Sequence, residues 1–460
     1  MGRPLRVAIV GSGPSGFYAA EALLKQSSPP VAVDMFDRLP TPYGLVRGGV
    51  APDHQKIKSV VAVYEKIASS PSFRFFGNVQ AGKDIQAEEL KSRYDQVVYA
   101  VGNESDRRLG IPGEDLKGSH SATAFVGWYN AHPDFQGERF DLSVESAVVV
   151  GVGNVAMDVA RLLAEDAGHL EPTDIAEEAL EALRQSRVRT ICLLGRRGPA
   201  QAAFSPAEIQ EIGSLESADL VVDAGELIVD EASRKDYQDP KNKKNVDYLK
   251  ERAKAGEGTR PRKIRLRFCV SPVEILGEGG RVKAVKVEKN RLALGKDGRV
   301  KSEGTGVFET LPAGLVLRSV GYRGVPIPGV PFDERSGHIP NAAGRVLDAP
   351  GGRPRPGEYV VGWAKRGPTG LIGTNRADSI ETVRMMAEDA AAGRFCPASA
   401  PDSESVPALL KKRGVRHVSF QDWKRLDVLE LARGKARGKA RRKFADVSQM
   451  LAALGEKAPA

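Results

Sequence analysis

The sequence predicts an α/β fold, in which parallel strands alternate with helices, and two glycine-rich turns carry this prediction. Residues 11–16 read G-S-G-P-S-G between an apolar run and an apolar-periodic run. Residues 151–156 read G-V-G-N-V-A in the same setting. Each turn breaks an apolar strand and opens a helix, which is typical of a nucleotide-binding unit. Two such turns in one chain are far less probable by chance than one.

The three glycines of the first turn are expected to have different roles. Gly11 is expected to make the tight turn, Gly13 to let the backbone approach a pyrophosphate, and Gly16 to let the helix pack on the strand. The following apolar strand, residues 31–36, is followed by Asp37. That residue stands at about the 20-residue spacing of the acid that binds a ribose hydroxyl. An acid there selects an unphosphorylated ribose, so the expected ligand is NAD or FAD.

The second turn is followed by a strand that ends differently. The apolar run 188–194 leads into Arg196 and Arg197, where an acid would otherwise stand. Arginine at this place accommodates a 2′-phosphate through paired hydrogen bonds. We therefore expect this half to bind NADP and the first half to bind FAD. Residues 168–187 are expected to form an extra helix before that strand.

Three further segments complete the predicted first part of the FAD domain. Residues 39–54 have neither helical nor strand periodicity, and so long an irregular loop is usually functional. A helix is expected at 56–69, followed by strands at 73–76 and 94–102.

After the second turn, the chain alternates again and then returns to the first domain. A charged surface excursion is expected at 230–262, followed by strands at 263–268, 282–288 and 315–321. The strand 358–363 is expected to bring the chain back to the first domain. A glycine-rich segment then precedes a helix expected at 377–391. Backbone donors at such a helix end can stabilise the anion of a reduced flavin.

The order of these elements predicts two Rossmann-like dinucleotide-binding domains, with the NADP domain inserted into a discontinuous FAD domain. The expected FAD domain comprises residues 1–105 and 324–460, the latter with a basic C-terminal tail, and the expected NADP domain comprises 106–323.

The composition of the chain excludes several classes of protein. The three cysteines, Cys192, Cys269 and Cys396, form no C-x-x-C pair, so no redox disulfide, zinc site or iron-sulfur cluster is expected, and no metal site of any kind. No leader and no apolar run near the roughly 18 residues of a membrane span is visible, so we expect a cytoplasmic protein without a membrane partner.

The net charge of +9 lies mostly in the tail, where residues 397–460 hold 14 Lys and Arg against 7 Asp and Glu. The basic run 433–443 can steer an acidic partner, bind nucleic acid non-specifically, or be simply solvated. No aromatic residues interleave with it, so no specific nucleic-acid binding is expected.

These motifs resemble the NADPH-ferredoxin reductases of the adrenodoxin reductase type, and especially their bacterial branch. The resemblance covers roughly residues 5–395 and rests on both glycine turns, on 42–54, on 196–199, and on 362–370. It implies a monomeric ferredoxin-NADP+ reductase that transfers hydride from NADPH to FAD and passes single electrons to an acidic ferredoxin. The family usually has Glu where this chain has Asp37, a shorter acid that needs a closer ribose.

The resemblance also implies site residues. Besides Gly11, Gly13 and Gly16, those for FAD are Ser15, Asp37, Leu45, Ala81, Trp363, Gly370, Leu371 and Ile372. Those for NADP are Val152, Gly153, Asn154, Val155, Arg196, Arg197, Glu208 and Gly370. His54 and Glu211 resemble the family's catalytic pair, which would orient or relay a proton. Without the resemblance, His54 and Trp363 would be expected to be structural, and Glu208 and Glu211 would be expected on a solvated helix face.

Other functions share parts of this pattern. A flavin monooxygenase has both turns but needs a chamber for an organic substrate, and no dedicated domain for one is visible. The missing C-x-x-C disfavours a disulfide reductase, and missing N-terminal cysteine clusters disfavour an amidotransferase-linked reductase subunit. A binding scaffold without turnover is disfavoured by the intact 39–54 loop and the arginine pair.

Overall fold

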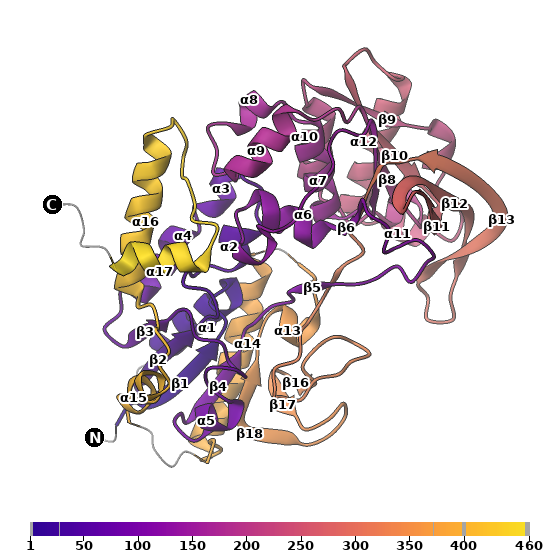
Figure 1. Ribbon diagram of the computed structural model, residues 1–460. Helices are drawn as coiled ribbons and strands as arrows, with labels where there is room; N and C mark the ends of the chain where they lie inside the picture. The colour runs from indigo at the N-terminus through magenta and orange to yellow at the C-terminus, as the bar shows by residue number, and fades with distance from the viewer. Residues whose placement is uncertain (1–2, 27, 371, 398–401, 456–460) are drawn as a thin grey trace. The chain divides into compact units, whose positions relative to one another are not determined.

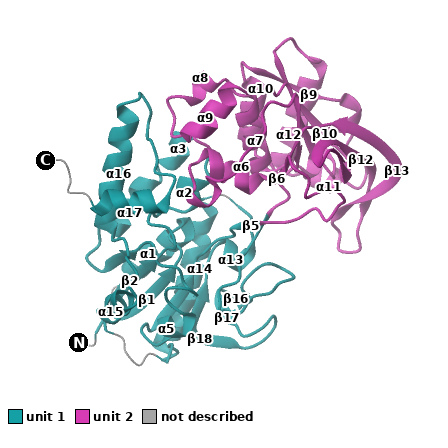
Figure 2. Ribbon diagram, viewed as in Figure 1, with its two compact units in different colours: residues 1–50, 54–105, 322–460 teal, residues 51–53, 106–321 magenta. Residues whose placement is uncertain are grey.

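The computed structural model describes residues 3–26, 28–370, 372–397 and 402–455. The chain divides into two compact units (Figure 2). Unit 1 holds residues 1–50, 54–105 and 322–460, and unit 2 holds residues 51–53 and 106–321. The chain leaves unit 1 at β5 (Ser105–Asp106) and returns at β15 (Tyr322–Arg323).

Unit 1 is built on a seven-stranded sheet in the order β16-β17-β18-β4-β1-β2-β3 (Figure 1). Five neighbouring strands, from β18 to β3, are parallel, and β17 and β16 are antiparallel. The strands are β1 (Leu5–Val10), β2 (Val31–Phe36), β3 (Phe73–Phe76), β4 (Gln96–Tyr99), β16 (Asn341–Ala342), β17 (Arg345–Leu347) and β18 (Pro354–Val360).

Helices and core clusters cover both faces of that sheet. In β1, Val7 and Ile9 belong to one core cluster, whereas Ala8 and Val10 belong to the other, as the two-residue period of a strand requires. The helices of unit 1 are α1 (Pro14–Leu24), α2 (Leu45–Gly48), α3 (Gln55–Lys58), α4 (Val61–Ala68), α5 (Ala87–Lys91), α13 (Trp363–Arg366), α14 (Thr374–Ala391), α15 (Ser405–Lys412), α16 (Phe420–Lys435) and α17 (Val447–Gly455).

Unit 2 contains a six-stranded, all-parallel sheet and a three-stranded antiparallel meander. The parallel sheet has the order β6-β14-β7-β8-β10-β9. Its strands are β6 (Ser119–Ser121), β7 (Ser146–Val150), β8 (Thr190–Gly195), β9 (Ala218–Val222), β10 (Arg262–Phe268) and β14 (Leu315–Arg318). The meander comprises β11 (Val270–Glu278), β12 (Arg281–Leu294) and β13 (Val300–Pro312).

Helices of unit 2 follow the strands as in other parallel α/β folds. They are α6 (Ala122–Tyr129), α7 (Asn154–Ala164), α8 (Ala167–Leu170), α9 (Glu177–Arg184), α10 (Pro206–Ser214), α11 (Arg234–Tyr237) and α12 (Pro240–Lys254), with short 3-10 turns at Pro133–Phe135, Pro199–Gln201 and Ala224–Leu227. The predicted α/β fold class is therefore confirmed. Among the helices in the described ranges, none has both the length and the apolar character that crossing a bilayer requires.

Several local expectations were wrong. The helix expected at 56–69 is two helices, α3 and α4, and no residue of α3 is buried, so no core contact aligns it with α4. The loop 39–54 contains the short helix α2. The strand expected to reach Trp363 stops at Val360, because Gly362 adopts φ 69° and turns the chain into α13.

The regions with few apolar residues also hold more structure than expected. The charged stretch 230–262 contains α11 and the long helix α12, in which Val246 and Leu249, three residues apart, are buried. Asp239 caps the first turn of α12, since its side chain accepts hydrogen bonds from two backbone amides. The expected extra helix within 168–187 is present as α9, preceded by α8.

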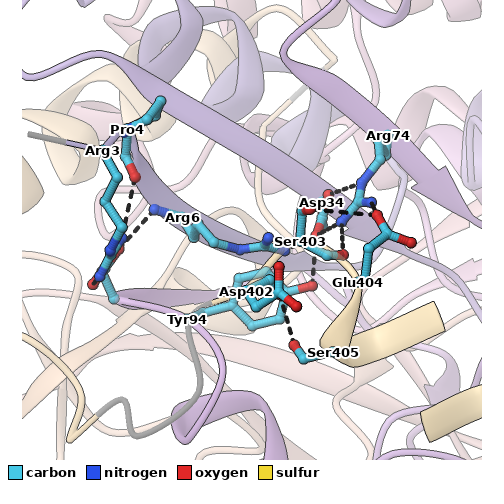
Figure 3. Close-up of polar contacts among 11 residues, drawn as sticks. Arg3, Pro4, Arg6, Asp34, Arg74, Tyr94, Asp402, Ser403, Glu404 and Ser405 are labelled. Atoms are coloured by element: carbon cyan, nitrogen blue, oxygen red, sulfur yellow. Dashed lines mark hydrogen bonds and ion pairs between the residues drawn. The ribbon is translucent and has the colours of Figure 1, made fainter. Parts of the chain in front are cut away.

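A buried carboxylate joins three strands of unit 1 (Figure 3). Asp34 of β2, only 4% exposed, accepts hydrogen bonds from Arg6 of β1 at 2.7 Å, from Arg74 of β3 at 2.8 and 2.7 Å, and from the Tyr94 hydroxyl at 2.7 Å. Burial, followed by the charge of Asp34, raises the pKa of Tyr94 well above its usual value, so the hydroxyl keeps its proton. Arg74 also donates to the Ser403 carbonyl at 2.8 Å, beside the start of α15.

We expect Asp34→Asn to lower the free energy of unfolding by about 3 kcal/mol, because it leaves the buried Arg6 guanidinium without its countercharge. Denaturant unfolding followed by circular dichroism measures this change. Glu21→Gln is the matched control, since its partners Lys25 and Arg376 are both largely exposed and such surface pairs contribute about 0.5 kcal/mol each or less. Equal effects of the two substitutions would contradict the prediction.

Candidate cofactor-binding sites

The glycine turn of unit 1 lies between the end of β1 and the start of α1. Gly11 has φ 105°, and a Cβ there would lie 2.5 Å from the carbonyl oxygen of Ala100, just after β4. A Cβ on Gly16 would lie 2.2 Å from the Gly11 carbonyl oxygen. Around Gly13, by contrast, no atom lies within 4 Å of an added Cβ. The first and third glycines are therefore required by packing, while the second leaves open space in front of the helix N-terminus.

Asp37 is held beside that turn at the end of β2. One of its carboxylate oxygens accepts hydrogen bonds from the backbone amide of Ser12, at 3.0 Å, and from the Ser12 hydroxyl. The other oxygen accepts the Leu39 amide at 2.9 Å. The acid is thus fixed in orientation at the carboxyl edge of the parallel strands, where ligands of open α/β sheets bind.

The irregular segment after Asp37 folds back over the turn. The Tyr43 amide donates to the Ser12 carbonyl at 3.0 Å, and a Cβ on Gly44 would lie 2.9 Å from the Gly13 Cα. Val46 is buried, whereas Leu45 is 39% exposed. Ala81 is half-buried in a separate loop after β3.

The returning part of unit 1 approaches the same helix end. Gly362 follows β18 with φ 69°, and a Cβ there would lie 2.0 Å from the Ser15 hydroxyl. Its amide donates to Asp378 at 2.6 Å. Gly370 has φ 82°, and Ile372 packs against the core cluster that contains α1. Leu371 lies outside the described residues.

Two side chains at this edge of the sheet carry buried polar atoms with no hydrogen-bond partner in the described part of the chain. They are the Trp363 indole nitrogen, after β18, and both amide atoms of Asn103, after β4. Asn103 is 4% exposed. Buried polar atoms are almost always paired in folded proteins, so these atoms fit a ligand that brings its own polar groups. Sequence reasoning missed Asn103, although its place directly after the Gly102 strand end is a usable signal.

The glycine turn of unit 2 has the same construction. Gly151 has φ 129°, and a Cβ there would lie 2.2 Å from the Ser319 carbonyl oxygen, after β14. Gly153 is open, since the nearest atom to an added Cβ is 4.0 Å away. The Val152 carbonyl accepts the amides of Ala203 and Phe204 at 3.0 and 3.2 Å. Asn154 and Val155 begin α7, and the Asn154 side chain accepts the Ser205 amide at 2.9 Å.

Arg196 and Arg197 follow β8, the strand beside β7. Arg196 is exposed and Arg197 is half-buried, and neither guanidinium forms a hydrogen bond or ion pair with any residue that the structure describes. Burial and the neighbouring charge of Arg196 lower the pKa of Arg197 below its ordinary value. Two adjacent cations that form no ion pair with a described carboxylate, and feel Asp236 only through its charge, fit a phosphate group.

The meander supports the backbone of this arginine pair. The Asn290 side chain of β12 donates to the Arg196 carbonyl at 2.8 Å and to the Ser271 hydroxyl at 2.8 Å. The Cys269 amide donates to the Arg197 carbonyl at 3.0 Å. Asn290 was not singled out from the sequence, because nearly a hundred residues separate it from its partner.

Glu208 and Glu211 lie on α10 of the same unit. Ser205 caps this helix by accepting the Glu208 amide at 3.3 Å. The Glu211 carboxylate lies 3.6 Å from the guanidinium of Arg161, which is only 1% exposed. Arg161 also pairs with Asp53 and, at 2.8 Å, with Asp158. Although burial opposes the charge, the carboxylates of Asp53 and Asp158 raise the pKa of Arg161, so it stays a cation.

His54 follows Asp53 in the chain and belongs to unit 1. Its carbonyl accepts the Ile57 amide at 3.0 Å, at the start of α3. Glu211 belongs to unit 2, and the predicted pairing of the two side chains stays a prediction.

Comparison with known proteins places these features in context. A family model described as pyridine nucleotide-disulphide oxidoreductase matches residues 5–191. NADPH-ferredoxin reductase FprA of Mycobacterium tuberculosis is 48% identical over 98% of this chain and 99% of its own length. The mitochondrial NADPH:adrenodoxin oxidoreductase of Homo sapiens is 43% identical over 98% of this chain and 92% of its own.

A solved structure of FprA from Mycobacterium tuberculosis in complex with NADPH superimposes with a TM-score of 0.93 at 46% identity. The match covers 99% of this chain and 100% of that one.

The cysteines lie in settings that suppress their reactivity. Burial raises the pKa of Cys192 and of Cys396 to about 12 and that of Cys269 to about 11. The thiolate is the reactive form of cysteine. The three thiols are therefore expected to stay protonated near neutral pH.

We expect the native protein to react with iodoacetamide at pH 8 at least about a hundredfold more slowly than free cysteine, because its thiolate fraction is on the order of one in a thousand or less. Mass spectrometry over time measures the labelling. Unfolding in urea is the control and should expose all three thiols. Rapid labelling of the native protein that also abolishes NADPH oxidation would contradict this expectation.

Proposed function

Because the chain belongs to the NADPH-ferredoxin reductase family of the adrenodoxin reductase type, we propose that it is an FAD-dependent ferredoxin-NADP+ reductase. In this proposal FAD receives hydride from NADPH and releases the two electrons singly to a ferredoxin. The observation that carries the proposal is the contrast between the two turns. One is followed by the fixed acid Asp37, and the other by the adjacent cations Arg196 and Arg197.

In unit 1, the residues at the carboxyl edge of the sheet fit FAD. The open space at Gly13 and the amides that begin α1 suit the diphosphate, and Asp37 suits a ribose hydroxyl. The unpaired indole nitrogen of Trp363 and the amide of Asn103 offer further polar contacts. The other residues assigned to FAD are Gly11, Ser15, Gly16, Leu45, Ala81, Gly370, Leu371 and Ile372.

In unit 2, the corresponding residues fit NADPH. The amides of Val152 to Val155 and the N-terminus of α7 suit its diphosphate. Arg196 and Arg197 suit the 2′-phosphate, which distinguishes NADPH from NADH. Glu208 is assigned to the carboxamide of the nicotinamide, and Gly370 to the nucleotide as well.

His54 and Glu211 are proposed to orient or transfer the proton that accompanies flavin reduction. Arg161 is proposed to position both residues. It attracts the Glu211 carboxylate directly, and it forms an ion pair with Asp53, the residue before His54. Because Arg161 is a buried cation beside three carboxylates, it favours their ionised forms, including that of Glu211.

The electron acceptor is proposed to be an acidic ferredoxin, and the enzyme to work as a cytoplasmic monomer. The basic run 433–443 contributes less positive surface than its composition suggests. Lys439 and Lys443 are 7% and 8% exposed, and Arg441 pairs with Asp427 and Glu430. Lys435 is exposed and can contribute to the attraction of an acidic partner.

The test of the whole proposal is anaerobic stopped-flow absorbance of the purified protein with NADPH or NADH, followed by oxidised ferredoxin. Faster bleaching of the flavin by NADPH, and its recovery on adding ferredoxin, support the reductase. The alternative is an NADPH-dependent flavin monooxygenase. It would be supported if reduced enzyme ignored ferredoxins and formed a long-lived oxygen adduct when air was admitted. A protein that never bleaches would instead be a binding scaffold.

We expect Arg196→Ala to lower kcat/KM for NADPH by about tenfold to a hundredfold, since a charge-assisted hydrogen bond contributes about 1.5–3 kcal/mol. The value for NADH should change by less than about twofold, because NADH has no 2′-phosphate. Steady-state reduction of a dye acceptor measures both. Arg187→Ala removes a basic residue from the loop before the same domain's β8 and serves as control. An equal loss for both nucleotides would contradict the assignment.

A further inference from the structure

We propose that the C-terminal segment of this protein is a latch that holds the loop 43–48 on the glycine turn of unit 1, and that Glu430 is the positioning residue through which it controls FAD retention. The latch is defined here as α16 together with residues 436–444. The inference rests on the proposed function only in taking FAD as the ligand of that turn. All of its residues lie in unit 1.

The loop that the latch would hold forms one wall of the glycine turn. The Tyr43 amide donates to the Ser12 carbonyl at 3.0 Å, and Gly44, at φ 48°, leaves only 2.9 Å between an added Cβ and the Gly13 Cα. Any displacement of the loop therefore moves atoms that touch the turn itself. The space beside Gly13 is the place where a diphosphate would lie.

The latch contacts that loop through charged and aromatic groups. Arg47 donates two hydrogen bonds to Glu430, at 2.8 and 2.6 Å, in the paired geometry that gives the strongest guanidinium-carboxylate interaction. The Arg47 guanidinium also lies 5.1 Å from the ring of Trp423, and the Trp423 indole donates to the Tyr43 hydroxyl at 3.2 Å. Lys443 donates to the Arg47 carbonyl at 3.0 Å.

Glu430 also joins the two parts of the latch, α16 and the segment 436–444. Its side chain is fully buried, and it accepts hydrogen bonds from Arg441 at 2.9 Å and from the Phe444 amide at 2.8 Å. Its backbone carbonyl accepts the Arg442 amide at 3.0 Å. One carboxylate thus joins the loop, the helix and the chain that follows the helix.

The charge of this carboxylate is what holds the three parts together. Burial opposes ionisation, but the guanidinium groups of Arg47 and Arg441 and the Phe444 amide lower the pKa of Glu430 below its ordinary value. At its two ends the loop differs, because Tyr43 and Val46 are buried in the core cluster of unit 1, whereas Arg47 and Gly48 are only half-buried. Loss of the charge at Glu430 should loosen the loop at Arg47 while the core contacts of Tyr43 and Val46 and most of the sheet stay intact.

The experiment compares FAD dissociation from the holoprotein of Glu430→Gln with that of the wild type, using the rise in flavin fluorescence after dilution. We expect the variant to release FAD at least about tenfold faster. Its affinity for 2′,5′-ADP, a probe of unit 2, should stay within about twofold. Thermal unfolding of each holoprotein reports any general loss of stability.

Glu65→Gln is the matched control, because Glu65 ties α16 to α4 through Lys424 at 2.6 Å and, among the described residues, forms no hydrogen bond or ion pair with the loop. Faster FAD release in both variants would show a general effect of loosening α16 and would overturn the proposal. Unchanged release in Glu430→Gln would overturn it as well. A wild-type protein that binds no FAD would instead refute the proposed function.

Trp423→Phe keeps the inference testable if Glu430→Gln does not fold. It removes the hydrogen bond to the Tyr43 hydroxyl and part of a buried ring, and it keeps an aromatic ring against Arg47. We expect it to accelerate FAD release by about threefold. No acceleration in this variant, together with normal folding, would contradict the proposed latch.

Discussion

Both units depend on one constraint, the close contact of the first glycine of each turn with the strand beside it. Gly11 faces the Ala100 carbonyl and Gly151 faces the Ser319 carbonyl, each too close to admit a Cβ. The turns also share their hydrogen bonds, since each glycine amide donates to the end of the next strand, at Phe36 or at Leu194. This contact fixes where each strand ends and where the following helix begins, and thereby places the open second glycine.

On that shared framework, the two units differ in charge at the end of the second strand. The first presents a carboxylate already oriented by the Ser12 and Leu39 amides, and the second presents two guanidinium groups whose backbone is supported by Asn290 and Cys269. A fixed acid suits hydroxyl groups, and paired cations suit phosphate. The same fold can therefore hold two different dinucleotides, and the difference depends on a few residues at one edge of each sheet.

The local pattern of the sequence was sufficient for the α/β fold class and the family, because glycine turns and apolar strands act over short distances. It did not predict the break between α3 and α4. It also did not predict α12, because the two buried apolar residues of that helix lie in a highly charged stretch. It also missed contacts that join distant positions. Arg47 and Glu430 meet across 383 residues, and no local signal marks either as the other's partner. The roles of the site residues stay predictions that rest on the family and on local geometry.

The interruption of unit 1 by unit 2 has a consequence for how the chain folds as it leaves the ribosome. In the sheet, β4 has β18 as a neighbour, and α1 packs against α14, yet the whole of residues 106–321 is translated between those partners. At roughly 5–20 residues per second, the first hundred residues must wait on the order of 10 to 50 seconds for their missing strand. During that interval the edge of β4 is unpaired and prone to wrong association. Unit 2 can complete its own sheet first, and co-translational chaperones should therefore bind the nascent chain mainly through its first hundred residues.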